Sequence, residues 1–205
     1  MKTNLLAILS AAVLLASCSG HTKKIIVYAN NDAAINEEAK TVVNKDNTGH
    51  LDKTLLYSTG DKVTISATFM DGKTTAIDIP EGGYYIVNTK AKDTIIGGFQ
   101  KYSTPQEANR VMTQDELKHN IDSLKQMVTG TNTNAANRTF FILPGTAAKI
   151  TANTDAEIVG PYHRMTSIAK VGDDEPEVYR FYSISEVRET IGKLEKLTVG
   201  PPANQ

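Results

Sequence analysis

The segment VTISATFMDGKTTAIDI, residues 63–79, has the clearest strand pattern in the chain. Apolar and polar residues alternate on both sides of Asp71-Gly72, which is typical of two half-buried strands joined by a tight turn. A two-residue turn would place Ile65 opposite Asp78 and mix the two faces, so we predict a three-residue loop, 70–72, with Gly72 at positive φ. The pairs predicted on one face are Val63 with Ile79, Ile65 with Ile77, and Ala67 with Thr75.

Further strand-like runs flank this hairpin and predict two groups of strands. The first group is interpreted as an antiparallel meander over residues 54–58, 62–69, 74–79, 83–89 and 93–99. The second group covers residues 140–143, 147–152, 157–162, 166–171 and 178–182. We therefore expect an α+β fold, mainly antiparallel, in which the two groups form a sandwich or an open barrel.

Helical signals occur between and after these strands. Capping-box spacing at Thr104 to Glu107 and at Thr113 to Glu116 predicts a helical excursion near 105–128, of which 114–128 is the clearer part. A third capping box, Ser183 and Glu186, opens a C-terminal amphipathic helix. Near the N-terminus, Asp32 is a candidate cap for a helix through Val43, and a strand at 41–44 is the alternative.

The first eighteen residues carry a separate pattern. Lys2 is followed by an apolar run from Leu5 to Leu15, which is too short to span a bilayer, and then by Leu15-Ala16-Ser17-Cys18. This stretch resembles the signal peptide and lipobox of bacterial lipoproteins. The alternative is an ordinary signal peptide in which Cys18 is incidental.

The lipoprotein resemblance implies a processed, membrane-anchored chain. Residues 1–17 would be removed, and Cys18 would become the N-terminus carrying fatty acyl chains such as palmitate. Ser19 is not the Asp that some bacteria use for inner-membrane retention, so the resemblance implies the outer membrane. We expect residues 18–24 to form a short tether and residues 199–205 a disordered tail. Residues 25–198 are expected to form a single β-rich domain, with two small domains as the alternative.

Composition excludes several classes of function. The chain has 22 basic and 23 acidic residues, and loss of Lys2 with the signal leaves a mature net charge of −2. Nucleic-acid binders normally carry a basic excess on one face, so we expect no nucleic-acid partner. Cys18 is the only cysteine. A mature chain whose single thiol is acylated has no disulfide, thiolate metal site or Cys nucleophile.

Linear motifs give weak candidates for chemistry. Ser167-x-x-Lys170 matches the pattern of a Ser/Lys dyad, but a strand at 166–171 would place the two side chains on opposite faces. Glu116-x-x-His119, with Asp115 and Asp122 nearby, resembles one arm of a metal site, and a solvated helical face is the favoured interpretation.

Other side chains depend on the fold for any role. His50, His163 and His21 can each act only if the fold brings a carboxylate near, and Lys23 and Lys24 could touch anionic headgroups. The acidic run Asp173-Asp174-Glu175 with Glu177 lacks the spacing of a calcium loop. Strand alternation predicts an outward ring in Tyr84-Tyr85 and in Tyr179 to Tyr182, a possible glycan or protein contact surface.

The sequence therefore predicts the cellular location of the protein more clearly than its activity. We expect a lipid-anchored cell-envelope protein, a non-enzymatic binding or assembly module with an envelope protein or glycan as partner and without cofactor, metal or catalytic residues. The alternative is a small envelope hydrolase whose site forms only in three dimensions around His50 or His163. A third possibility is a subunit of a larger envelope assembly.

Overall fold

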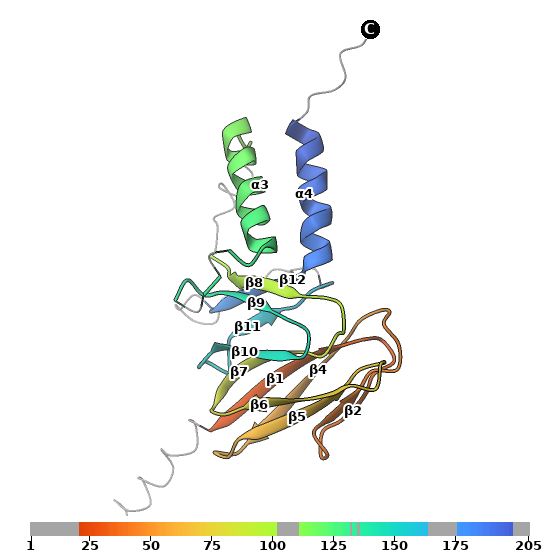
Figure 1. Cartoon of the computed structure of the whole chain (residues 1–205). Coiled ribbons are helices and arrows are strands. Elements are labelled where there is room, and N and C mark those ends of the chain that lie inside the picture. The colour runs from red at the N-terminus through yellow and green to blue at the C-terminus, as the bar shows by residue number, and fades with distance from the viewer. Residues whose placement is uncertain (1–20, 102–110, 132, 135, 164–175, 199–205) are drawn as a thin grey trace, which may run out of the picture. The chain divides into compact units, whose positions relative to one another are not determined.

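The computed structural model describes residues 21–101, 111–131, 133–134, 136–163 and 176–198 (Figure 1). This part of the chain forms two compact units. Unit 1 takes the chain up to Thr89 together with Gly145–Thr154, and unit 2 takes Lys90–Pro144 and the chain from Asp155 onward. The segment 145–154 thus belongs with the N-terminal half of the sequence.

Unit 1 contains two four-stranded sheets. The first has the order β10-β7-β1-β4, and its strands are β1 (Thr22–Ala29), β4 (Leu51–Ser58), β7 (Gly83–Asn88) and β10 (Thr146–Thr151). The second has the order β2-β3-β5-β6, and its strands are β2 (Ala34–Asn36), β3 (Thr41–Val43), β5 (Val63–Thr68) and β6 (Thr74–Ile79). Both sheets are mixed, because β1 runs parallel to β7 and β3 runs parallel to β5.

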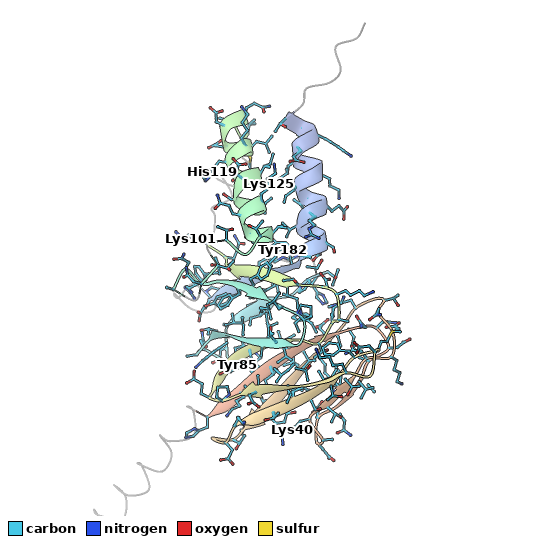
Figure 2. All side chains as sticks on the ribbon, in the orientation of Figure 1. Lys40, Tyr85, Lys101, His119, Lys125 and Tyr182 are labelled. Atoms are coloured by element: carbon cyan, nitrogen blue, oxygen red, sulfur yellow. The ribbon has the colours of Figure 1, made fainter. Side chains whose placement is uncertain are left out.

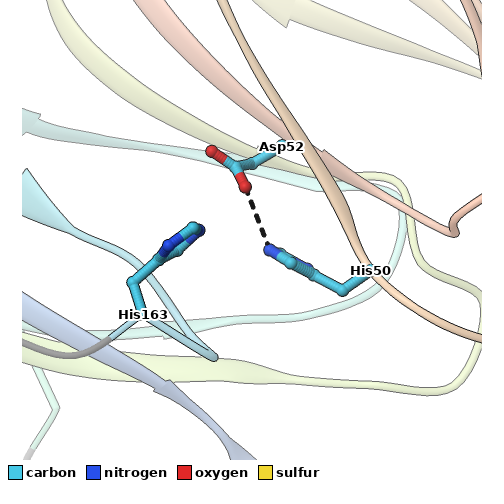
Figure 3. Close-up of side chains that lie close together, drawn as sticks. All are labelled: His50, Asp52 and His163. Atoms are coloured by element: carbon cyan, nitrogen blue, oxygen red, sulfur yellow. Dashed lines mark hydrogen bonds and ion pairs between the residues drawn. The ribbon is translucent and has the colours of Figure 1, made fainter.

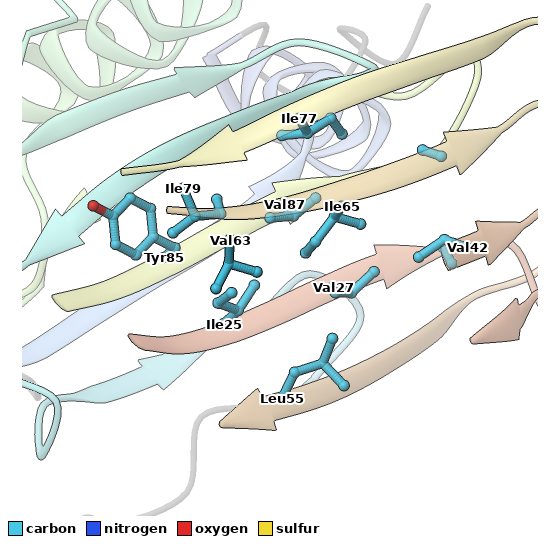
Figure 4. Packing of buried hydrophobic residues seen from close by; sticks show 12 residues of the cluster. Ile25, Val27, Val42, Leu55, Val63, Ile65, Ile77, Ile79, Tyr85 and Val87 are labelled. Atoms are coloured by element: carbon cyan, nitrogen blue, oxygen red, sulfur yellow. The ribbon is translucent and has the colours of Figure 1, made fainter. Parts of the chain in front are cut away.

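The core of unit 1 lies between these two sheets (Figure 4). Alternate residues of β1 and β7 face alternate residues of β5 and β6, as period-2 strands require when two sheets pack face to face. The buried apolar side chains are Ile25, Val27, Ala29, Val42, Leu55, Val63, Ile65, Ala67, Ile77, Ile79, Tyr85 and Val87. Unit 1 is therefore a β-sandwich.

The hairpin predicted at 63–79 is confirmed in register and in loop length. Val63 pairs with Ile79, Ile65 with Ile77, and Ala67 with Thr75. Phe69 N donates to Lys73 O, which leaves residues 70–72 as the loop, and Gly72 has φ +78°. On the exposed face, Asp78 accepts hydrogen bonds from Thr64 and Lys62 at 2.7 and 3.0 Å.

Unit 2 contains one mixed sheet of the order β11-β12-β8-β9. Its strands are β8 (Ile95–Phe99), β9 (Thr139–Ile142), β11 (Glu157–Val159) and β12 (Val178–Ser183). The strands approach closely at Gly97, where an added Cβ would lie 2.1 Å from Arg180 O. A residue without a side chain is required there.

In the described part of unit 2, two helices accompany the sheet, α3 (Gln114–Val128) and α4 (Ile184–Thr198). They lie side by side and rise from the sheet at β8 and β12 (Figure 1). Their apolar stripes meet around Ile121, Val187 and Ile191, and Lys125 pairs with Glu195 at 2.8 Å across the helices (Figure 2). No helix in the described ranges is long and apolar enough to cross a membrane.

The helix starts confirm the predicted capping boxes. Thr113 accepts from Glu116 N while Glu116 accepts from Thr113 N at 2.8 Å. Ser183 and Glu186 form the same reciprocal pair at the start of α4. Because each side chain satisfies a backbone donor that the helix leaves open, these four residues set where both helices begin.

The α+β fold class is confirmed: the described residues form open, mixed sheets with mostly antiparallel pairing, together with two helices, one of them C-terminal. The predicted meander is wrong: β4 pairs with β1, β7 pairs with β1 and β10, and β8 pairs with β9 and β12. Alternation identifies a strand but not its neighbour. The neighbours here are set by pairing between segments that lie far apart in the sequence.

The N-terminal part of unit 1 corrects two further expectations. The helix expected after Asp32 is wrong, since β2 and β3 occupy the region, and the alternative strand at 41–44 is confirmed as β3. β1 begins at Thr22 rather than at Ile25, so Lys23 and Lys24 belong to a strand and not to a tether. The expectations for residues 1–17, Cys18, 104–107, 166–171 and 199–205 lie outside the described residues.

Candidate functional site

His50 and Asp52 form a carboxylate–imidazole pair in unit 1. His50 directly precedes β4 and Asp52 is the second residue of that strand, so i and i+2 alternation puts both side chains on one face. His50 Nε2 and Asp52 Oδ1 lie 3.1 Å apart (Figure 3). The imidazole also stacks on Tyr28, with ring centroids 5.7 Å apart and planes at 26°. Tyr28 is buried, and it lies opposite Asp52 in the register of β1 and β4. The imidazole and the carboxylate are therefore both next to the same buried residue.

A network of buried amides holds the loop that leads to His50. Asn44 Oδ1 accepts from Asn30 N at 3.2 Å, and Asn44 Nδ2 donates to Thr89 O at 3.0 Å. Asn30 Nδ2 donates to Asp46 O at 2.7 Å. Because each of these bonds satisfies a polar group away from water, the loop has a defined path.

Gly49 lets this loop turn into β4. It has φ +66°, and an added Cβ would lie 2.5 Å from the Cβ of Asn31. Glycine tolerates that backbone conformation, and its lack of a side chain permits the close approach. His50 therefore enters the strand in a fixed orientation.

The pair has the geometry of a base and its orienting carboxylate. A carboxylate that accepts from one ring nitrogen sets the tautomer and orientation of the other nitrogen, the arrangement used for proton transfer. For a metal, His50 and Asp52 are two ligands, whereas protein zinc sites supply three or four. Of the other two predicted histidines, His163 is an exposed residue of unit 2, and His21 is an exposed residue of unit 1 directly before β1.

A second group of ionisable residues lies in unit 2 and was not predicted as a site. Lys90, Asp93, Tyr162, Ser183 and Glu186 form it, and we name it the Lys90 cluster. Tyr162 Oη donates to Asp93 Oδ2 at 2.5 Å. The ammonium of Lys90 lies 3.4 Å from Tyr162 Oη, 3.9 Å from Asp93 Oδ2 and 4.8 Å from the centroid of the Tyr162 ring. The ring therefore stabilises the cation by a cation–π contact.

Glu186 connects this cluster to the start of α4. One carboxylate oxygen accepts from Ser183 N at 2.8 Å, and the other accepts from Tyr162 N at 3.0 Å. Tyr162 has φ +65°, a conformation that bulky residues rarely adopt. The bond to Glu186 is thus part of what holds a strained residue in place.

Burial sets the protonation of the Lys90 cluster. It raises the pKa of the Tyr162 phenol to about 12, and the hydrogen bond to Asp93 adds to that effect. Burial also lowers the pKa of Lys90, while the charges of Asp93 and Glu186 oppose the decrease. The phenol thus remains a proton donor at neutral pH, and two carboxylates compensate the lysine, an arrangement that holds three chain segments together.

Of the acidic run Asp173-Asp174-Glu175 with Glu177, the structure describes Glu177. This residue connects strands. Its carboxylate forms an ion pair with Arg138 and accepts from Tyr179 Oη at 2.7 Å. Arg138 lies over the ring of Phe99, with Cζ 3.7 Å from the centroid. The carboxylate therefore joins the ends of β9 and β12, and Asp173, Asp174 and Glu175 lie outside the described residues.

The expected outward tyrosine rings are wrong for Tyr84 and Tyr85. Both are buried, because both faces of β7 are covered. Tyr179 is buried as well, between Phe99 and Phe140, and Tyr182 is half-buried against the helices. Alternation assumed a sheet with one solvated face, and these central strands have none.

The helical face at Glu116 and His119 is solvated, as favoured. Asp115, His119 and Asp122 are exposed, and Glu116 is engaged by its helix cap. Figure 2 shows His119 on the side of α3 away from α4. Ser167 and Lys170, like Cys18, lie outside the described residues.

Comparison of the chain with protein-family models, with curated proteins and with solved structures found no match.

Proposed function

We propose that this protein is a lipid-anchored component of a bacterial cell envelope, held by an acylated Cys18 and acting as a binding or assembly module. The observation that carries the proposal is the stretch Leu15-Ala16-Ser17-Cys18 after a short apolar run. It is supported by β1, which begins at Thr22 and so makes the mature chain fold almost directly after the anchor.

The engagement of the ionisable groups favours binding over catalysis. In the Lys90 cluster and around Arg138, each carboxylate accepts hydrogen bonds that join separate chain segments. Such networks fix a fold, whereas a catalytic base must reach a substrate proton. We propose an envelope protein or glycan as the partner and, from Ser19 after Cys18, the outer membrane as the location.

Metabolic labelling with a clickable fatty acid tests the anchor. The wild-type chain should take up the label and fractionate with the envelope, and Cys18→Ala should do neither. Ser19→Ala is the matched control and should keep the label. Absence of label on the wild type, or undiminished label on Cys18→Ala, contradicts the proposal. Crosslinking in intact envelopes should then identify the partner.

A small hydrolase is the second candidate, and the His50–Asp52 pair is the observation that favours it. If His50 is a general base, Asp52→Asn should lower hydrolysis of a nitrophenyl ester or peptide panel by about 10²-fold or more. Asp61→Asn, at the other end of β4, is the matched control. Equal rates for the wild type and Asp52→Asn exclude this candidate.

A further inference from the structure

We propose that the end of unit 1 at which β1 begins lies against the phospholipid surface that holds Cys18, with β1 directed away from the bilayer. This inference rests on the proposed lipid anchor and adds to it the face that meets the membrane. We name this face the anchor end. It comprises the start of β1 and the loops 59–62, 80–82 and 152–154.

Strand register collects these loops at one end of unit 1. Thr22 pairs with Ser58, so the loop after β4 lies beside the start of β1. Lys23 pairs with Gly83 in the parallel strand β7, which places the turn before β7 there too. Thr151, at the end of β10, pairs with Tyr84, so the loop after β10 completes the group.

Two lysine side chains fix the start of β1 to this end. Lys23 is fully buried, and its Nζ donates to Thr59 O at 2.7 Å. Lys24 Nζ donates to Thr154 O at 3.0 Å and lies 4.4 Å from the centroid of the Tyr84 ring. Three residues, 19–21, separate Cys18 from the start of β1 at Thr22, and four Cα steps reach about 14 Å at most.

The charges of the anchor end suit contact with polar headgroups. Lys62 pairs with Asp78 at 3.0 Å, and Lys149 pairs with Glu81 at 2.8 Å. These pairs offset the charges of Lys62 and Glu81, and the remaining charged side chain of the three loops is the exposed Asp61. The loops therefore carry little net charge to repel anionic lipids or to draw the loops into them. The loops 59–62, 80–82 and 152–154 carry no large apolar side chain, so this face lies on the headgroups and does not insert.

The opposite end of unit 1 lies beyond the reach of the headgroups. Ala29 pairs with Leu51, so the loop 45–50 lies where β1 ends. Seven steps of strand from Thr22 to Ala29 span about 23 Å, and each headgroup layer is about 5–8 Å thick. The His50–Asp52 pair accordingly faces away from the bilayer.

Single-cysteine labelling tests this orientation cleanly, because acylation of Cys18 leaves no other thiol in the mature chain. Acylated Asp61→Cys and Asn47→Cys chains are labelled with a thiol-reactive fluorophore. Both positions are exposed, one at each end of unit 1. The chains are reconstituted into vesicles of phosphatidylcholine with a minor fraction of phosphatidylglycerol, some of it carrying a headgroup nitroxide quencher. Vesicle flotation is measured first.

We expect quenching at position 61 to exceed quenching at position 47 by about threefold or more, since the two ends differ by about 23 Å in height. Insertion of about ten Gly and Ser residues after Ser19 should remove the difference by freeing the tether. Equal quenching, or stronger quenching at position 47, in floating chains overturns the orientation and leaves the anchor standing. Acylated chains that do not float overturn the anchor itself.

Discussion

The Nζ of Lys23 donates a 2.7 Å hydrogen bond to the carbonyl oxygen of Thr59, thirty-six residues away. The lysine stem is buried along its whole length, and the bond joins the first residues of β1 to the loop after β4. A residue that was expected in the tether 18–24 is thus part of the sandwich. The position of the first residues of β1 depends on this buried lysine.

Lys23→Ala should therefore destabilise the chain. The substitution removes the packed stem and leaves Thr59 O without this donor, for a loss of about 3 kcal/mol in the free energy of unfolding. Urea denaturation of the chain that lacks its signal peptide measures the effect. Lys45→Ala, at an exposed lysine of the same unit, should change stability by no more than about 0.5 kcal/mol. Equal effects of the two substitutions would show that Lys23 is dispensable.

Gly97→Ala should be one of the most damaging small substitutions in unit 2. The added Cβ would lie 2.1 Å from Arg180 O and 2.7 Å from the Cα of Phe181, both backbone atoms that cannot move independently. We expect a loss of about 3 kcal/mol. The matched control is Gly192→Ala in α4, where nothing lies within 4 Å of the new Cβ.

Gly192→Ala should stabilise the chain by about 0.5–1 kcal/mol, because alanine loses less conformational entropy in a helix. Thermal unfolding followed by circular dichroism compares both variants with the wild type. A Gly97→Ala chain that melts with the wild type would mean that β8 and β12 are not packed as described.

The two capping glutamates should differ in importance. Glu186 accepts from two backbone donors, Ser183 N and Tyr162 N, whereas Glu116 serves the cap at Thr113. We expect Glu186→Ala to cost about 2 kcal/mol and Glu116→Ala about 1 kcal/mol. Denaturant titrations of both variants measure the difference. A larger loss for Glu116→Ala would argue against the bond from Tyr162 to Glu186.

Tyr162 should make the free energy of unfolding depend on pH in the alkaline range. Its pKa is about 12 in the folded chain and 10.0 unfolded, so the folded state holds the phenol proton more tightly. The resulting stabilisation is fully present below pH 10 and is lost as the pH rises towards 12. The stability difference between the wild type and Tyr162→Phe should shrink over that window. A difference that stays constant from pH 9 to 12 would show that the phenol does not titrate late.

Local chemistry made much of the fold predictable from sequence. The 63–79 hairpin, its loop and both helix starts depend on residues within a few positions of each other, and all of these predictions are confirmed. Strand neighbours were not predictable. β1 and β7 are parallel and buried on both faces, so their apolar runs show no alternation that could name a partner.

The candidate site divides in the same way. His50 was a predicted candidate, but its partner Asp52 was not, because the predicted strand began at residue 54 whereas β4 begins at Leu51. The Lys90 cluster joins Lys90 and Asp93 to Tyr162 and Glu186, which are about seventy or more residues further along the chain. Only Glu186 had a sequence signal, its capping-box spacing, and that signal concerned the helix alone.

Mass spectrometry of the N-terminal peptide of the protein purified from its native envelope tests the lipid anchor on Cys18. We expect a mature chain that begins at Cys18 and carries the mass of covalently attached fatty acyl groups. A chain that retains residues 1–17, or that begins at another residue with no acyl group, would contradict it.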